Sequence, residues 1–175
     1  VGLYATAFIA MGVFVSMYNF FGFRAVLDYG LPAGLSGLVY VVYLSGTWSS
    51  ARAGVFSKRY GRGVAVLASA LLMLLGALAV AASNLWVALV GLLVFTASFF
   101  ALHSTASGWV GLIAERDRAE ASSMYVFCYY MGSSILGAAT GWAYEALPWA
   151  GFVAVLAALL AALALVAAAL WRGAR

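Results

Sequence analysis

Charged residues are scarce in this sequence, and their scarcity excludes most classes of soluble protein. Of 175 residues, nine are Lys or Arg and five are Asp or Glu, so that 8% are charged, against about 25% in an average soluble domain. The mean hydropathy is +1.07. A soluble domain of this size needs far more charge on its surface. The composition therefore predicts an integral membrane protein and argues against a soluble enzyme, a nucleic-acid-binding protein or a disordered segment.

Cysteine and histidine are almost absent as well. Cys128 is the only cysteine and His103 the only histidine. One cysteine excludes a disulfide framework, and one cysteine with one histidine cannot supply a tetrahedral metal site. We therefore expect no metal and no other cofactor.

What the sequence does contain is a series of long uncharged runs, at 1–23, 29–51, 63–114, 121–144 and 146–171. A helix that crosses a bilayer needs about 20 apolar residues. The run 63–114 is twice too long for one crossing, and Ser83-Asn84 offers a turn within it. Dividing it there predicts six spans: 1–23, 34–56, 63–83, 85–112, 121–144 and 148–171. The runs are too long and continuous for barrel strands, so we expect an all-α bundle.

Proline and glycine mark two of the expected helix starts. Pro32, in Gly30-Leu31-Pro32, precedes the second span, and Pro148 opens the sixth, where a missing N–H costs nothing. Val1 already lies inside an apolar run, without a basic segment or cleavage pattern before it. We therefore expect residues 1–175 to be a single six-helix bundle within a longer chain, and not to begin with a signal peptide.

The basic residues collect between particular spans and predict an orientation. They lie after span two, after span four and at the C-terminus: Arg52, Lys58, Arg59, Arg62, Arg116, Arg118, Arg172 and Arg175. Arg24 alone falls on the other side. The positive-inside rule then places both termini in the cytoplasm. Arg24, Asp28 and Glu145 are expected as solvated charges at the outer side, and Trp86, Trp149 and Trp171 as interfacial anchors.

Polar side chains follow a three-helix pattern that occurs twice. Hydroxyl, amide and imidazole groups concentrate in spans one, two, four and five, whereas spans three and six have almost no polar side chains. Lipid tails give no reason to place hydroxyls, so the polar spans should face one another or a wet cavity. Two three-helix units must have opposite topology in the membrane. The pattern predicts an inverted 3+3 repeat, as in secondary transporters.

The loop after span two reads Gly54-Val55-Phe56-Ser57-Lys58-Arg59-Tyr60-Gly61-Arg62-Gly63. It resembles the loop signature of the major facilitator superfamily, with matches at Gly54, Arg59, Gly61 and Arg62. Lys58 replaces the usual acidic residue, which favours the degraded copy of the signature in the C-terminal half of that family. Independently, we expect Gly54 to allow close helix approach and Gly61 to take a positive φ in a tight reversal.

Residues 100–111 and 115–125 are similar to helices ten and eleven of bacterial efflux-type facilitators. The resemblance covers nearly the whole chain and implies the C-terminal six of twelve helices, in a bacterial plasma membrane. It implies helices seven, eight, ten and eleven around a cavity, with nine and twelve outside. It also implies proton-coupled efflux of a small molecule by alternating access, with an N-terminal six-helix half as partner.

The candidate cavity residues are polar or aromatic side chains of the four polar spans: Tyr18, Asn19, Tyr40, Tyr43, Thr47, His103, Tyr125 and Tyr129. Tyr40, Tyr43 and Thr47 share one helix face. His103 is the ionisable group best suited to carry a coupling proton, because imidazole titrates near neutral pH. The other interpretation of all these residues is interhelical hydrogen bonding.

Small residues recur at Ser133, Gly137 and Gly141, a spacing that lets helix backbones approach closely. We expect them to pack against another helix, with a moving gate helix or a dimer face as the alternative.

Two other functions are compatible with parts of this sequence. A stand-alone six-helix scaffold or assembly subunit would use its hydroxyls only for packing. An intramembrane rhomboid-like protease would need a Gly-x-Ser-Gly motif and a histidine on a second helix, but here Thr105 replaces the first glycine and His103 shares its helix with Ser107. We therefore do not expect an enzyme.

Overall fold

The computed structural model describes residues 1–174, with every side chain except those of residues 33, 35, 36 and 38. Arg175 lies outside this range. The described residues form six α-helices and one long 3₁₀ helix. These are α1 (Gly2–Leu27), η1 (Ala33–Val42), α2 (Tyr43–Tyr60), α3 (Arg62–Val80), α4 (Leu85–Ile113), α5 (Arg118–Ala146) and α6 (Trp149–Gly173).

The expected helix boundaries agree with the structure to within a few residues. Gly61 separates α2 from α3 with a φ of +90°, as the turn prediction required. The Asn84 side chain accepts hydrogen bonds from the backbone N–H groups of Trp86 and Val87 and so caps α4. Pro148 is the N-cap of α6, one residue before the helix begins.

The second predicted span differs from a plain α-helix. Residues 33–42 form the 3₁₀ helix η1, which runs directly into α2. Glycines at 34 and 37 and valines at 39, 41 and 42 have low α-helix propensity, which accounts for the change of helix type.

By length and composition alone, four described helices are apolar enough to cross a membrane: α1, α3, α4 and α6. The other two expected spans carry more polar side chains, including Arg52, Lys58 and Arg59 in α2 and a series of hydroxyls in α5. The count of six crossings therefore remains a prediction.

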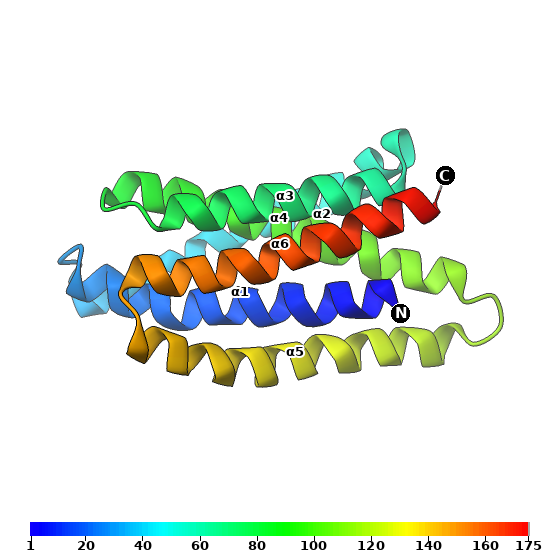
Figure 1. The fold of residues 1–175 in the computed structure, drawn as a ribbon. Coiled ribbons are helices and arrows are strands. Elements are labelled where there is room, and N and C mark those ends of the chain that lie inside the picture. Colours follow the sequence, from blue (N-terminus) through cyan, green and yellow to red (C-terminus); the bar gives the residue numbers. More distant parts are fainter. Residues whose placement is uncertain (175) are drawn as a thin grey trace.

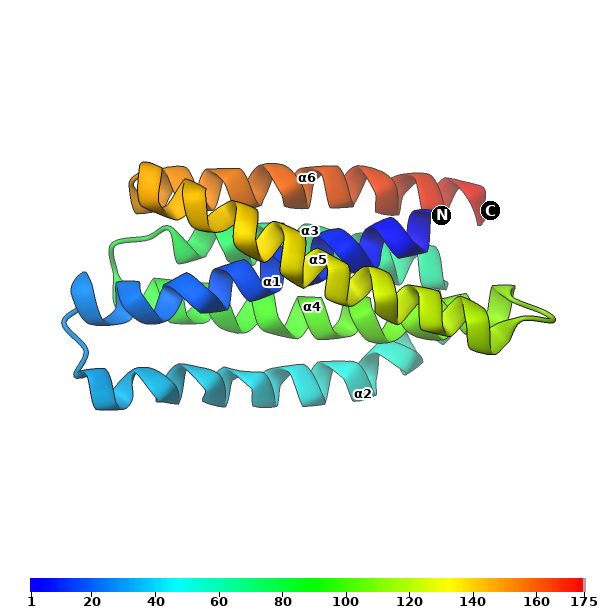
Figure 2. The same cartoon turned by 90° about the horizontal axis from the view of Figure 1, so that it is seen from below.

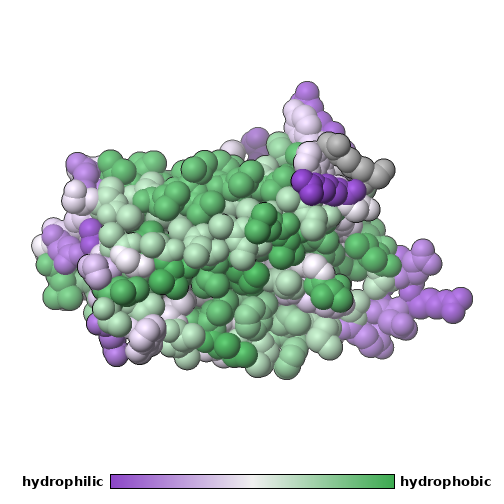
Figure 3. Space-filling view, viewed as in Figure 1, coloured by the Kyte–Doolittle hydropathy of each residue, from purple (hydrophilic) through white to green (hydrophobic). Residues whose placement is uncertain are grey.

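The helices run roughly along one axis, so that the connections gather at two ends (Figures 1 and 2). Both termini, the turn at Gly61 and the α4–α5 loop lie at one end. The other three connections lie at the opposite end. Because the described basic residues other than Arg24 are near the first group, we call it the basic end. A broad apolar surface separates the hydrophilic ends (Figure 3).

The core is built from pairs of helices: α1 packs on α5, α2 on α4, and α3 on both α4 and α6. Large side chains that are fully buried include Met17, Phe21, Met73, Phe95 and Phe152. On α3 the exposed side chains include Leu71, Leu72, Leu75 and Leu78, which is what a lipid-facing helix requires.

Candidate functional site

Three of the candidate tyrosines meet where α1, η1 and α2 converge. The Tyr18 ring lies 4.9 Å from the Tyr43 ring and 5.7 Å from the Tyr40 ring, measured between centroids. Tyr18 is buried, and its hydroxyl shares a hydrogen bond of 2.6 Å with the Thr96 hydroxyl of α4. The phenol is therefore held in place from a fourth element, which leaves its ring face toward Tyr40 and Tyr43.

Three further candidates meet between α4 and α5. The Tyr125 hydroxyl lies 3.2 Å from Nδ1 of His103, and the Tyr129 ring centroid lies 4.8 Å from that of the imidazole. Tyr125 is buried, whereas His103 and Tyr129 are half-buried. A partly exposed imidazole with a neutral hydrogen-bond partner can exchange a proton with water or with a substrate.

Phenylalanines join the two groups into one cluster. Phe100 makes an edge contact with Tyr43 at 5.7 Å and with Phe99 at 5.4 Å, and Phe99 stacks on His103 at 6.1 Å. We call the whole set the aromatic band. Its members are Phe14, Tyr18, Tyr40, Tyr43, Phe99, Phe100, His103, Tyr125 and Tyr129.

The remaining two cavity candidates lie outside the band. Asn19 is exposed and lines a cavity of about 510 Å³ between α1 and η1, together with Tyr18, Gly22 and Tyr40. Thr47 is exposed on α2, and its neighbours Gly46 and Ser50 turn toward Phe100 of α4 instead. Tyr40 and Tyr43 stay side by side across the change of helix type, with 5.8 Å between their ring centroids.

Chemically the band offers ring faces, phenolic hydroxyls and one imidazole. Among its described members there is no Lys, Arg, Asp or Glu, so it can stack on flat groups and hydrogen-bond to neutral ones. The partner of the His103 imidazole is the Tyr125 hydroxyl, which comes from a second helix.

The family-like loop behaves only partly as expected. Gly61 makes the reversal, and Lys58, Arg59 and Arg62 are exposed at the basic end. The expectation for Gly54 was wrong, because a Cβ built there would meet nothing within 4 Å. The close approach occurs instead at Gly63, whose added Cβ would lie 2.7 Å from Cα of Trp171.

Close packing between α1 and α5 centres on a glycine that the predicted spacing did not include. A Cβ on Gly132 would overlap the backbone carbonyl of Phe8, and one on Gly12 would lie 2.7 Å from the Gly132 carbonyl oxygen. At Gly137 and Gly141 the nearest atoms are 3.7 Å away, an ordinary contact. The Ser133 hydroxyl donates to the Tyr130 carbonyl within its own helix.

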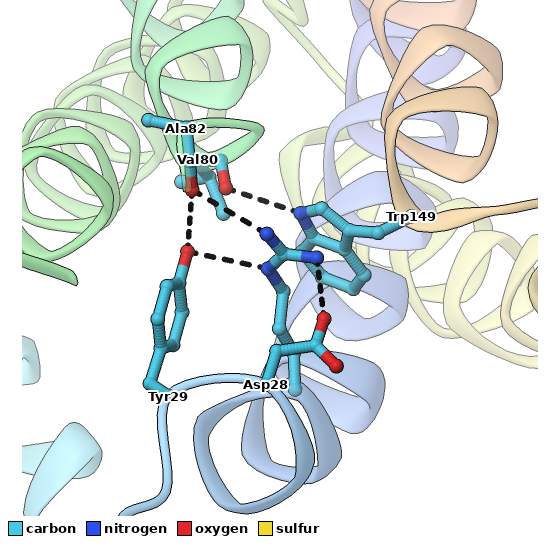
Figure 4. Close-up of polar contacts among 6 residues, drawn as sticks. Asp28, Tyr29, Val80, Ala82 and Trp149 are labelled. Carbon is cyan, nitrogen blue, oxygen red and sulfur yellow. Dashed lines mark hydrogen bonds and ion pairs between the residues drawn. The ribbon is translucent and has the colours of Figure 1, made fainter. Parts of the chain in front are cut away.

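A cluster that no sequence motif indicated lies at the end opposite the basic end (Figure 4). The Arg24 guanidinium pairs with Asp28 at 2.7 Å and donates to the Tyr29 hydroxyl and the Ala82 carbonyl. Tyr29 donates to the same carbonyl at 2.6 Å. The Trp149 indole N–H donates to the Val80 carbonyl at 3.1 Å. Arg24 and Trp149 therefore join three connections, where a solvated charge and an interfacial anchor were expected.

Comparison with protein-family profiles gives no match for this chain. Individual proteins, in contrast, are similar to it over most of its length. The chain is 43% identical over 171 residues to the inner membrane transport protein YnfM of Escherichia coli. The aligned residues cover 97% of this chain and 41% of YnfM. It is 32% identical over 159 residues to the MFS-type transporter YybF of Bacillus subtilis, covering 90% of this chain and 39% of the relative.

An uncharacterized transporter of Buchnera aphidicola is 36% identical over 150 residues, which cover 85% of this chain and 36% of the relative. The chain thus spans well under half the length of the relatives it matches. These matches run along nearly all of the chain and agree with its apolar helices and its loop motif. The chain belongs to the MFS-type transporters, the major facilitator superfamily, and corresponds to a portion of such a protein.

Proposed function

We propose that this chain is the C-terminal six-helix half of a secondary transporter that moves a small molecule across a bacterial inner membrane by alternating access. The observation that carries the proposal is the aromatic band. Side chains far apart in sequence, on α1, η1, α2, α4 and α5, converge on one uncharged cluster with a single imidazole. These are the elements that the polar pattern assigned to a cavity.

The packing of the helices supports an inverted 3+3 repeat. If α1, α2 and α3 correspond to α4, α5 and α6, then the contact of α1 with α5 corresponds to that of α4 with α2. The α3–α6 contact lies between equivalent helices. Both relations are what a two-fold axis in the membrane plane requires.

A missing partner half would account for the apolar side chains that α2 and α5 leave exposed. The largest include Leu44, Trp48, Val55, Phe127, Tyr130 and Trp142. A second six-helix bundle would cover part of this surface and close a substrate site between the two halves. Both termini would then lie in the cytoplasm with the basic end.

His103 is the group in the band that we assign to proton coupling. Binding a proton changes the imidazole from a neutral to a cationic group. The charge would change the fit of the band for substrate as access alternates, which suits exchange of protons for an exported molecule.

The test uses the protein encoded by the complete reading frame that contains this chain. It is expressed in E. coli, and everted membrane vesicles are prepared from the cells. Respiration acidifies the vesicle lumen, and a dye reports the pH of the lumen. An added compound that is exchanged for protons makes the lumen less acidic, and the dye signal changes. A panel of sugars, amino acids and aromatic compounds serves as the probe. We expect at least one compound to give a saturable response that Tyr43→Ala abolishes and Thr47→Ala, on the same helix but outside the band, leaves intact.

No response to any compound, or equal responses of the two variants, would contradict the proposal. The reading frame itself provides a separate check. Six further spans upstream support the half-transporter, whereas a start codon close to Val1 supports the stand-alone scaffold instead.

A further inference from the structure

A cavity of about 480 Å³ opens at the basic end, between the α2–α3 turn and helices α4 and α6. It is lined by Tyr60, residues 61–64, Trp109, Trp171 and Ala174. One wall is firmly built, because Gly63 brings the start of α3 against the backbone of Trp171. Tyr and Trp side chains at the end of membrane-spanning helices are typical of the level of lipid headgroups.

The charge of this cavity favours an anion. Arg62 is the charged residue among its described lining residues, and none of them is Asp or Glu. Arg59, on the preceding turn, lies over the Tyr60 ring with its guanidinium carbon 5.2 Å from the centroid. A guanidinium binds phosphate oxygens with charge-assisted hydrogen bonds. Among the described lining residues, no carboxylate is present to pair with the ammonium group of a zwitterionic headgroup.

An apolar cavity of about 670 Å³ adjoins the first and shares Trp109 and Ala174 with it. Its other lining residues include Ile113, Val166, Ala169 and Leu170, from α4 and α6. A free phosphate ion would use only the first cavity. A molecule with an anionic head and a hydrocarbon tail would use both.

We propose that the two cavities together bind one anionic phospholipid. Its headgroup phosphate accepts hydrogen bonds from the Arg62 guanidinium, and one acyl chain follows the groove between α4 and α6. The bound lipid would hold the α2–α3 turn against the end of α6. The site is independent of whatever the aromatic band transports.

The test is native mass spectrometry of the complete protein in detergent, with phosphatidylglycerol or phosphatidylethanolamine added. We expect phosphatidylglycerol to bind more tightly than phosphatidylethanolamine. Arg62→Gln should weaken phosphatidylglycerol binding at least about tenfold, the loss expected for a hydrogen bond to a charged group. Ala169→Phe, which fills the apolar groove, should weaken it too. Arg116→Gln removes an exposed charge from the same end but outside both cavities, and should change nothing.

Arg62→Lys keeps the charge and should retain most of the binding, which separates loss of the site from loss of folding. Equal affinity for the two lipids, or equal effects of Arg62→Gln and Arg116→Gln, would overturn the proposal. So would a complete chain that binds neither lipid because further residues fill the cavities. A last measurement adds inorganic phosphate and follows the thermal stability of the protein. If phosphate stabilises the protein, Ala169→Phe leaves this effect unchanged and no lipid binds, the site belongs to a free anion instead.

Discussion

Replacing Gly132 by alanine should loosen the contact between α1 and α5, whereas the same change at Gly137 should not. A Cβ at residue 132 would overlap the Phe8 carbonyl and approach Cα of Phe8 to 2.7 Å. Both obstructing atoms belong to the backbone of α1, so the two helices must move apart. Overpacking of this kind costs about 1–3 kcal/mol.

Helix propensity acts in the opposite direction and sets the expected balance. Alanine is about 1 kcal/mol better than glycine inside a helix. Because the obstructing atoms at Gly132 are backbone atoms, we expect an overpacking cost in the upper part of the range, about 2–3 kcal/mol. The propensity gain then leaves a net loss of about 1–2 kcal/mol. At Gly137 the nearest atom to an added Cβ is Cγ1 of Val15 at 3.7 Å, so Gly137→Ala should be neutral or slightly stabilising.

The assay is equilibrium unfolding of the complete protein in lipid bicelles. Unfolding can be followed by labelling of Cys128, the single cysteine of this sequence, which is half-buried on the same helix. The order of stability should be Gly137→Ala at or above the parent and Gly132→Ala below it. Equal stability of the two variants would refute the assignment of the close contact to Gly132, and a greater loss at Gly137 would restore the spacing predicted from the sequence.

Three further predictions concern the turn, the buried hydroxyl pair and the imidazole. Gly61→Val should reduce folded protein more than Arg62→Lys does, since a φ of +90° excludes a β-branched residue; equal yields in membranes would contradict the turn. Tyr18→Phe should cost about 1 kcal/mol, and a double-mutant cycle with Thr96→Val should show coupling; additive losses would mean that the 2.6 Å contact contributes nothing. His103→Gln should flatten the dependence of transport rate on pH in the complete transporter; an unchanged rate and profile would make His103 structural.

Local signals predicted most of the helix boundaries correctly. Asn84 caps α4 and Gly61 turns the chain between α2 and α3, because caps and positive-φ turns depend on a few adjacent residues. Hydropathy separated the long apolar runs from one another because it too depends only on neighbouring residues. The type of helix in residues 33–42 was not predictable in this way, since a long apolar run gives the same hydropathy signal for α and 3₁₀ geometry.

Contacts between helices were harder to predict. A small-residue spacing identifies a face of α5 but does not say which position meets the partner most closely, because that depends on the crossing point of two helices. Here the crossing puts Gly132 against Phe8, outside the predicted set of Ser133, Gly137 and Gly141. Six of the cavity candidates, all tyrosine or histidine, come together, and their spans were identified from hydropathy. The other two, Asn19 and Thr47, are exposed and lie outside the aromatic band.

Arg24 is the exception to the charge asymmetry of the bundle, and the structure gives a physical reason for it. The end of α3 leaves the carbonyls of Val80 and Ala82 without helical partners. Arg24 and Tyr29 donate to the Ala82 carbonyl, and Trp149 donates to that of Val80.

These partners are 53 to 69 residues apart in sequence, so no local pattern could have paired them. Asp28 lies 2.7 Å from the guanidinium and offsets its charge, so Arg24 adds little net positive charge to this end. Among residues 1–174, the basic side chains without an acidic partner lie at the opposite end, and they are the ones that count for orientation. Arg24 is therefore explained by the hydrogen bonds that the helix ends require, and it does not weaken the prediction that the basic end faces the cytoplasm.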